Sequence, residues 1–233
     1  MQVFAVDAYN AWWQKGNDFY GKKEFDSAAF YYEKLTVLNP LDAVVYYNLG
    51  NTYYRLNKIG PAVLYYEKAL RLDPGYTDAK DNLSLTQSRI ANRVPNVPDI
   101  FFVSWWKTLT EPGKATAWAI ICLVLFLSVL GILLMKRFGR ISHVSPQLIG
   151  FISFGWIIFL ILSIYAAANA NDSNSAVVMQ NNAPLLNVIQ GKTQSLVPEG
   201  TTVQLTDIKG NWVEIRLPDG RRGWMQQSLL SKI

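Results

Sequence analysis

The chain has 233 residues, room for one or two folded domains, and its 22 Lys and Arg against 17 Asp and Glu give a formal charge of +5. The basic excess lies mainly in residues 99–170, with five Lys and Arg against two Asp and Glu, so neither end of the chain has the cationic face that nucleic-acid binding requires. Because Cys122 and His143 are the only cysteine and histidine, we expect no metal site, no cofactor, no small-molecule substrate and no catalytic centre of the Ser-His-Asp or Cys-His type.

Residues 1–94 match themselves when shifted by 34 positions. Apolar residues within each copy recur at helical spacing, which predicts helices over 9–21, 25–38, 43–56 and 59–72. A fifth helix, "TDAKDNLSLTQSRIANRV", has no partner helix after it, as expected for the cap of a repeat array. The matching positions are Trp12/Tyr46, Gly16/Gly50, Phe19/Tyr53, Ala28/Ala62, Tyr32/Tyr66 and Pro40/Pro74, and we expect Trp12, Tyr46, Phe19 and Tyr53 in the core.

The second copy, "YYNLGNTYYRLNKIGPAVLYYEKALRLDP", resembles a tetratricopeptide repeat over nearly its whole pattern. The resemblance implies an all-α solenoid of two repeats and a capping helix, whose first helices line a groove for extended peptides. Asparagine amides in this groove can donate to and accept from a peptide backbone, and its aromatic rings offer apolar contact. The alternative is that this face packs against the chain's own segment 95–114. The expected groove residues are Trp13, Asn17, Tyr20, Tyr47, Asn51, Tyr54, Arg55, Asp81 and Arg89.

Residues 95–114 place Phe101, Phe102, Trp105 and Trp106 at helical spacing. Aromatic rings beside lysines favour the headgroup layer of a bilayer, so the segment is predicted to lie in the membrane interface. Packing of the segment against the N-terminal domain is the alternative interpretation.

Residues 115–135 and 148–168 are two runs of 21 residues without charge, each long enough to cross a bilayer, and they predict a transmembrane hairpin over 115–168. The loop between them carries Lys136, Arg137 and Arg140 and no acidic residue. Because basic residues in short loops stay cytoplasmic, both ends of the chain are predicted to be periplasmic, in a bacterial inner membrane. The start "MQVFAVDA" is too short for a signal peptide, so the orientation requires either a trimmed leader or a longer chain; otherwise it is reversed.

After a polar linker at 169–175, residues 176–233 contain short β-rich runs separated by tight turns, which predict a small all-β barrel. "VPEGTTVQLTDIKGNWVEIRLPDGRRGWMQQSLL" resembles a bacterial SH3-like domain through its "EGT", "GNWVEI" and "GW" segments. Such domains often carry an Arg and a Pro in a longer first loop, and "LLNVIQGKTQSL" lacks both, which puts a ligand site on that loop in doubt. Trp212 and Trp224 are expected in the core rather than on a ligand platform.

The order of repeats, hairpin and SH3-like domain resembles the BatE proteins of the Bacteroides aerotolerance operons. This resemblance implies a non-enzymatic, membrane-anchored scaffold that binds other Bat membrane proteins, some with von Willebrand A domains, in envelope stress or oxygen tolerance. A cell-wall protein that binds peptidoglycan through the SH3-like domain is the alternative. A transport or enzyme-complex subunit is less favoured, because the spans hold no charged or strongly polar residue except Asn169 at the edge.

Overall fold

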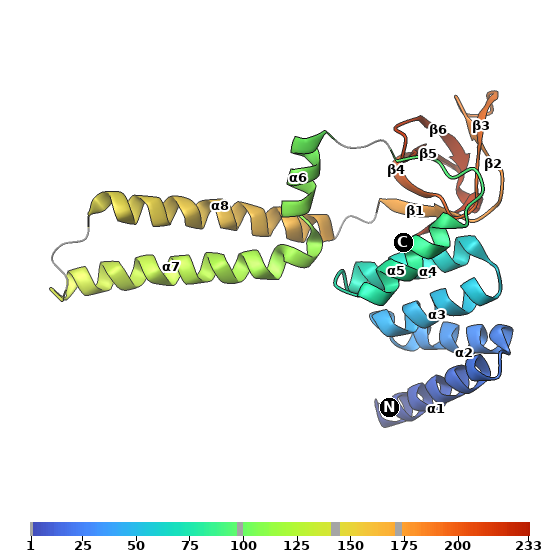
Figure 1. Cartoon of the computed structure of the whole chain (residues 1–233), viewed down its shortest axis with the longest axis horizontal. Helices are drawn as coiled ribbons and strands as arrows, with labels where there is room; N and C mark the ends of the chain where they lie inside the picture. Colours follow the sequence, from blue (N-terminus) through green and yellow to red (C-terminus); the bar gives the residue numbers. More distant parts are fainter. Residues whose placement is uncertain (1, 97–99, 141–144, 171–173) are drawn as a thin grey trace. The chain divides into compact units, whose positions relative to one another are not determined.

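The computed structural model of the chain describes residues 2–96, 100–140, 145–170 and 174–233 (Figure 1). These residues form two compact units, one combining Met1–Val97 with Ser173–Ile233 and the other comprising Pro98–Asp172. We call the first the repeat–barrel unit and the second the hairpin unit, and we describe each by itself.

The N-terminal part of the repeat–barrel unit consists of antiparallel helix pairs (Figure 1). The helices are α1 (Gln2–Gly21), α2 (Phe25–Leu38), α3 (Ala43–Arg55), α4 (Ile59–Leu72) and α5 (Thr77–Ser88). The helices predicted over 25–38 and 59–72 are confirmed, and α1 begins at Gln2 rather than at residue 9 because no Gly or Pro interrupts the first turns. The carboxylate of Asp42 caps α3 by accepting hydrogen bonds from the backbone N–H groups of Val44 and Val45, at 2.9 and 3.2 Å.

Within each pair, a buried tyrosine on the second helix lies against a glycine on the first. A Cβ added at Gly50 would come within 2.5 Å of the Tyr66 ring, and one at Gly16 within 2.7 Å of the Tyr32 ring. Only glycine allows the two helices to approach this closely, which explains why the glycine and the tyrosine recur together in both copies. The expected core aromatics Trp12, Phe19, Tyr46 and Tyr53 all pack, partly buried, against this core.

The C-terminal part is an antiparallel sheet of the SH3-like type, as predicted. Its strands are β1 (Ser175–Val178), β2 (Ala183–Leu186), β3 (Thr193–Val197), β4 (Thr202–Lys209), β5 (Trp212–Arg216), β6 (Arg222–Gln226) and β7 (Leu230–Lys232), in the order β3-β2-β6-β5-β4-β1-β7. Side chains alternate across the sheet, so Val213, Ile215 and Met225 fill the core. The expectation that Trp212 and Trp224 lie in the core is wrong: both alternate with these residues, lie on the outer face and are partly exposed.

The barrel covers the open end of the repeat array. Helix α4 packs against β1, where Val63, Leu64 and Val177 share one buried cluster. The chain beyond α5 continues into the barrel, and Val94 is buried in the barrel core. Within the described residues, the barrel thus lies where a further repeat would place a partner helix for α5. It covers the end of the solenoid, which would otherwise be exposed.

The hairpin unit contains α6 (Phe101–Leu109), a 3-10 turn at Pro112–Lys114, α7 (Ala115–Arg137) and α8 (Pro146–Ala170) (Figure 1). Among the described residues, α7 and α8 are the helices long and apolar enough to cross a membrane, with mean hydropathies of 2.9 and 2.3. They run antiparallel and touch through aromatic pairs, with ring centroids 5.5 Å apart for Trp118 and Phe159 and 5.7 Å for Phe126 and Trp156. Both helices are apolar on all sides, which is typical of a membrane span.

We expect Gly50→Ala to lower the free energy of unfolding of the repeat–barrel unit by about 1–3 kcal/mol, because the new methyl group overlaps the buried Tyr66 ring. Gly21→Ala is the matched control, since a Cβ at Gly21 meets nothing within 4 Å. The measurement is chemical unfolding of the full chain in detergent, followed by circular dichroism. Equal unfolding midpoints for the two variants would contradict the close approach of α3 and α4.

Candidate protein-binding groove and membrane-interface helix

The groove predicted on the first helices of the repeats contains a cavity of about 180 Å³. Four of the residues predicted for the groove line this cavity: Tyr20 on α1, and Asn51, Tyr54 and Arg55 on α3. The rest of the cavity lining was not predicted from the sequence and consists of Tyr66, Asn82, Leu85 and Thr86. Asn17 and Asn51 lie 34 residues apart, and we call this pair the asparagine ladder. Leu85 continues the ladder at the same spacing, so extending it onto α5 is the signal that could have found Leu85.

The two ladder asparagines are tied into the repeats by their amide oxygens. The Oδ1 atom of Asn17 accepts a hydrogen bond from the buried Tyr32 hydroxyl, and Oδ1 of Asn51 accepts one from the Tyr66 hydroxyl, each at 2.7 Å. The Nδ2 amide of Asn82 also donates to Oδ1 of Asn51, at 2.8 Å. In the described part of the chain, the amide nitrogens of Asn17 and Asn51 therefore remain as donors for a ligand, so this ladder suits backbone carbonyl groups.

The tyrosine hydroxyls that hold the ladder stay protonated at neutral pH. Burial raises the pKa of Tyr32 to about 12, and the neighbouring Tyr20 makes a smaller contribution in the same direction. Burial also raises the pKa of Tyr66, with a smaller contribution from Tyr47. Both hydroxyls thus act as donors to the asparagines, and replacing either asparagine by alanine leaves a buried hydroxyl without its acceptor.

The remaining residues predicted for the groove, Trp13, Tyr47, Asp81 and Arg89, do not line the cavity themselves. Trp13 meets Tyr32 edge-on with ring centroids 6.1 Å apart, and Tyr47 packs against Tyr66 and Tyr76. The Arg89 guanidinium lies 4.4 Å from the centroid of the Tyr54 ring, which brings a second cation to the cavity that Arg55 lines. Asp81 is exposed on α5 and is not part of the cavity lining. The groove therefore combines aromatic walls, amide donors and two guanidinium groups.

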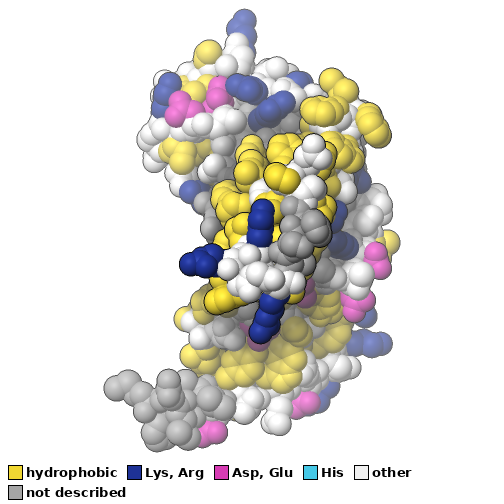
Figure 2. Space-filling view, turned by 90° about the vertical axis from the view of Figure 1, so that its left-hand side faces the viewer, with side chains coloured by type: hydrophobic (Ala, Val, Ile, Leu, Met, Phe, Trp, Pro, Cys, Tyr) yellow, Lys and Arg dark blue, Asp and Glu magenta, His cyan; other side chains and the backbone are white. Residues whose placement is uncertain are grey.

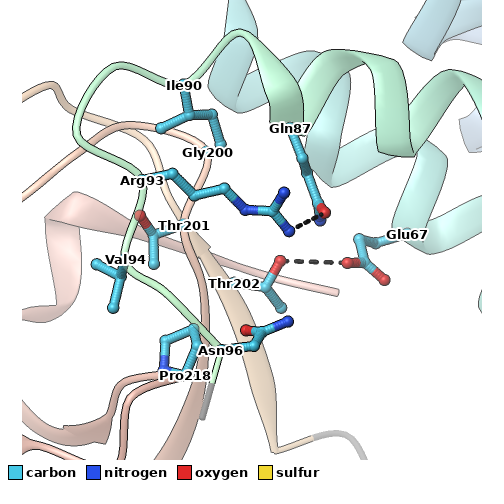
Figure 3. A pocket seen from close by; sticks show the side chains of 10 residues that line it. All are labelled: Glu67, Gln87, Ile90, Arg93, Val94, Asn96, Gly200, Thr201, Thr202 and Pro218. Atoms are coloured by element: carbon cyan, nitrogen blue, oxygen red, sulfur yellow. Dashed lines mark hydrogen bonds between the residues drawn. The ribbon is translucent and has the colours of Figure 1, made fainter. Parts of the chain in front are cut away.

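A second cavity, of about 230 Å³, lies at the contact between repeats and barrel (Figure 3). The Thr202 hydroxyl donates to the Glu67 carboxylate at 3.2 Å, and Arg93 donates to the side chain of Gln87 at 2.9 Å (Figure 3). Burial raises the pKa of Glu67, and the hydrogen bond from Thr202 partly offsets this increase. The barrel also binds the start of α4, where the Glu199 carboxylate accepts from the Gly60 N–H at 2.7 Å.

In the hairpin unit, the predicted interface residues lie on α6 and are exposed. The side chains of Phe101 and Phe102 are 83% and 67% exposed, and Trp105 and Trp106 are more than a third exposed. The C-terminal end of α6 is fixed to the hairpin, because the Trp118 indole donates to the Leu109 carbonyl at 2.8 Å. Trp106 also meets the Tyr165 ring of α8, with centroids 5.7 Å apart. An apolar helix thus extends from the base of the hairpin, where α7 begins and α8 ends.

The opposite end of the hairpin carries the predicted topology residues. Lys136 and Arg137 form the last turn of α7, and Arg140 follows it. Figure 2 faces this end and shows Lys and Arg side chains gathered around the loop. His143 lies outside the described residues.

Comparison with known proteins agrees with the two folded parts. The tetratricopeptide repeat family matches residues 43–76, and the bacterial SH3 domain family matches residues 195–232. No match was found among curated proteins. The chain thus contains tetratricopeptide repeats, two candidate membrane helices and a bacterial SH3-like domain. Both kinds of module are typical of non-catalytic interaction proteins.

Two solved structures are similar to parts of the chain. One is the first tetratricopeptide domain of Spaghetti (RPAP3) bound to the HSP90 peptide SRMEEVD, 24% identical, covering 35% of this chain and 65% of that chain with a TM-score of 0.34. The other is the TPR2B domain of yeast Sti1 in a pHsp70 complex, 14% identical, covering 70% of this chain and 98% of that chain, also with a TM-score of 0.34.

We expect the unfolding free energy of the full chain to depend on pH through Glu67. Because its pKa is raised in the folded state, the stability it contributes is fully present below the ordinary carboxyl pKa of 4.5 and is lost as the pH rises through the raised pKa. Glu67→Gln removes this loss. The free energy of unfolding of the variant minus that of the natural chain is therefore expected to be larger at pH 8 than at pH 5. Chemical unfolding at both pH values measures the difference, with the exposed Glu24→Gln as the control. An identical pH dependence in the natural chain and Glu67→Gln would refute the assignment.

Proposed function

We propose that the protein is a non-enzymatic, membrane-anchored scaffold that binds extended segments of partner proteins in its repeat groove. The observation that carries this proposal is the cavity at Asn51, Tyr54 and Arg55, which offers an amide donor, an aromatic wall and a cation on rigid helices. Such a surface can hold a peptide backbone by its carbonyl groups and cover its apolar side chains.

The partners we propose are other Bat-type membrane proteins, including those with von Willebrand A domains, in an envelope-stress or aerotolerance complex. The support for this identity is the order of modules along the chain: repeats, hairpin and SH3-like domain. The two guanidinium groups at Arg55 and Arg89 favour a segment with acidic residues near the cavity, since each cation lies against an aromatic ring rather than in an ion pair among the described contacts.

We further propose a bacterial inner-membrane location with both folded parts in the periplasm and the loop at Lys136, Arg137 and Arg140 in the cytoplasm. The charge of the loop supports this orientation. The shared core of repeats and barrel supports an even number of spans between them, because two packed domains occupy the same compartment. Helix α6 is proposed to lie in the periplasmic headgroup layer, where Phe101, Phe102, Trp105 and Trp106 contact lipid.

Binding of peptidoglycan through the barrel is a second candidate function. One observation favours it: the outer face of the barrel carries a cavity of about 690 Å³ lined by Trp212. Retention of the full chain on purified cell-wall sacculi, lost when residues 171–233 are removed, distinguishes this function from protein scaffolding.

The scaffold function is tested by exposed groove residues whose replacement leaves the core intact. Arg55→Glu and Leu85→Asp change the charge and apolar surface of the cavity without removing an acceptor from Tyr32 or Tyr66. We expect each variant to reduce partner capture about tenfold, a loss of about 1.4 kcal/mol in binding. Capture is measured by cross-linking in intact membranes, purification of the chain and quantification of the proteins attached.

Lys232→Glu is the matched charge-reversal control, because Lys232 is exposed on β7 of the barrel and lies outside the groove. The same proteins captured in the same amounts by Arg55→Glu, Leu85→Asp and the control would refute peptide binding in the groove.

A further inference from the structure

The outer face of the barrel presents a tryptophan that the fold does not use in its core. Trp212 begins β5 and lies opposite Gln226 of β6, whereas Val213 and Met225, the next pair along, fill the barrel interior. Trp212 is partly exposed and lines a cavity of about 690 Å³. The other lining residues are Gln190, Asn211, Gln226, Gln227 and Ser228.

The chemistry of this lining is polar and uncharged. It combines one indole ring, four carboxamide groups and one hydroxyl, with no charged side chain in the described lining. Each carboxamide both donates and accepts hydrogen bonds, so the site suits a neutral ligand rich in hydroxyl and amide groups. An indole ring offers a broad apolar face to a ligand that is polar only at its rim. A sugar ring has this combination, with C–H groups on its faces and hydroxyl or acetamido groups around its edge.

The position of the site is set by the sheet rather than by side chains alone. The backbone N–H of Gln227 donates to the Asn211 carbonyl at 2.9 Å, which ties the end of β6 to the turn before β5. Asn211 and Trp212 are therefore held close to Gln226 and Gln227, where the start of β5 adjoins the end of β6. Gln190 lines the cavity from the loop between β2 and β3, so a second segment contributes to the site.

The topology favours a sugar over an extended peptide. Strand β5 lies inside the sheet and pairs with β4 and β6, so a peptide cannot add to it as a further strand. Strand β6 pairs with β5 along its length and with β2 at Trp224. The neighbouring charged side chains on the same face, Lys209 and Glu214, already have partners within the barrel. Lys209 lies 5.1 Å from the Trp224 ring centroid, and the Glu214 carboxylate accepts a hydrogen bond from Thr206 at 2.6 Å. A ligand that needs an ion pair thus has no evident partner among the described lining residues.

We propose that this cavity binds a neutral, N-acetylated sugar chain, with Trp212 against a ring face and the carboxamides of Asn211, Gln226 and Gln227 around the hydroxyl and acetamido groups. The proposal rests on the cell-wall function and names its ligand as the glycan rather than the peptide part of the wall. It is independent of the repeat groove.

The test is a titration of the purified full chain in detergent with the tetramer of β-1,4-linked N-acetylglucosamine, followed by calorimetry. We expect saturable binding, weakened at least tenfold by Trp212→Ala. Trp224→Ala is the matched control, because Trp224 lies on the same outer face but outside the cavity lining, and it should bind as the natural chain does. Gln226→Leu and Gln227→Leu alter exposed side chains only and give a second test if Trp212→Ala does not fold.

A second arm identifies the source of the sugar by comparing retention on intact sacculi with retention on the peptide-free glycan strands that an amidase releases from them, immobilised on beads. Retention on both, reduced by Trp212→Ala, supports the cell-wall glycan, and binding of the free tetramer alone supports a soluble oligosaccharide. Retention on intact sacculi only, without binding of the tetramer, overturns the glycan proposal and leaves cell-wall binding in place. Failure to bind any of the three overturns both the glycan proposal and cell-wall binding. Equal binding by Trp212→Ala and Trp224→Ala overturns the assignment of the site to Trp212.

Discussion

Helix α4 lies against strand β1, and this contact joins the two ends of the chain into one unit. Val63 and Leu64 of the second repeat pack on Val177 of the barrel, and Glu199 binds the Gly60 N–H across 139 residues of sequence. Burying each apolar side chain contributes about 1.5–3 kcal/mol, whereas one hydrogen bond contributes about 0.5–1.5 kcal/mol. Burial thus stabilises the docking, and the bonds at Gly60 and Glu67 set its register.

This contact constrains the membrane topology as well as the fold. The hairpin unit is inserted between two halves of one core, so its two ends are required on the same side of the membrane. A two-span hairpin meets this requirement, and we propose that the charge of its loop decides which side that is. Helix α6 fits the same arrangement, because its C-terminal end is bonded to the base of the hairpin and its exposed aromatic side chains suit a headgroup layer.

The docked barrel also determines which surfaces remain for partners. It covers α4 at the end of the array and leaves the cavity on α3 and α5 lined by Tyr54, Arg55 and Leu85. The outer face at Trp212 belongs to β5 and β6, which lie away from the docked strands β1 and β7 in the sheet order. A protein segment in the groove and a sugar chain on the barrel would therefore use separate surfaces of one compact unit. We propose that the protein could in this way hold a partner near the cell wall.

Local pattern was sufficient to predict the helices, the spans and the small barrel. The period of 34 placed Gly50 and Tyr66 on paired helices, and the two uncharged runs placed the hairpin. Pattern failed where the answer depends on packing between distant segments. The alternation in β5 shows that one face is buried, but only the assembled sheet decides that Val213 rather than Trp212 is inside. The docking of Val63 on Val177 has no local signature, and neither has the hydrogen bond that occupies Asn51.

The central claim, that repeats and barrel form one unit in the periplasm, is tested most directly by labelling single cysteines with a membrane-impermeant maleimide. All variants carry Cys122→Ser, which removes the natural cysteine. Each then receives one new cysteine at an exposed position: Lys22→Cys on the repeats, Lys232→Cys on the barrel or Ser145→Cys beside the loop. In cells with a permeabilised outer membrane, we expect Lys22→Cys and Lys232→Cys to react and Ser145→Cys to stay unlabelled until the inner membrane is opened. Labelling of only one of the two domain positions would contradict the shared unit, and labelling of Ser145→Cys alone would contradict its periplasmic orientation.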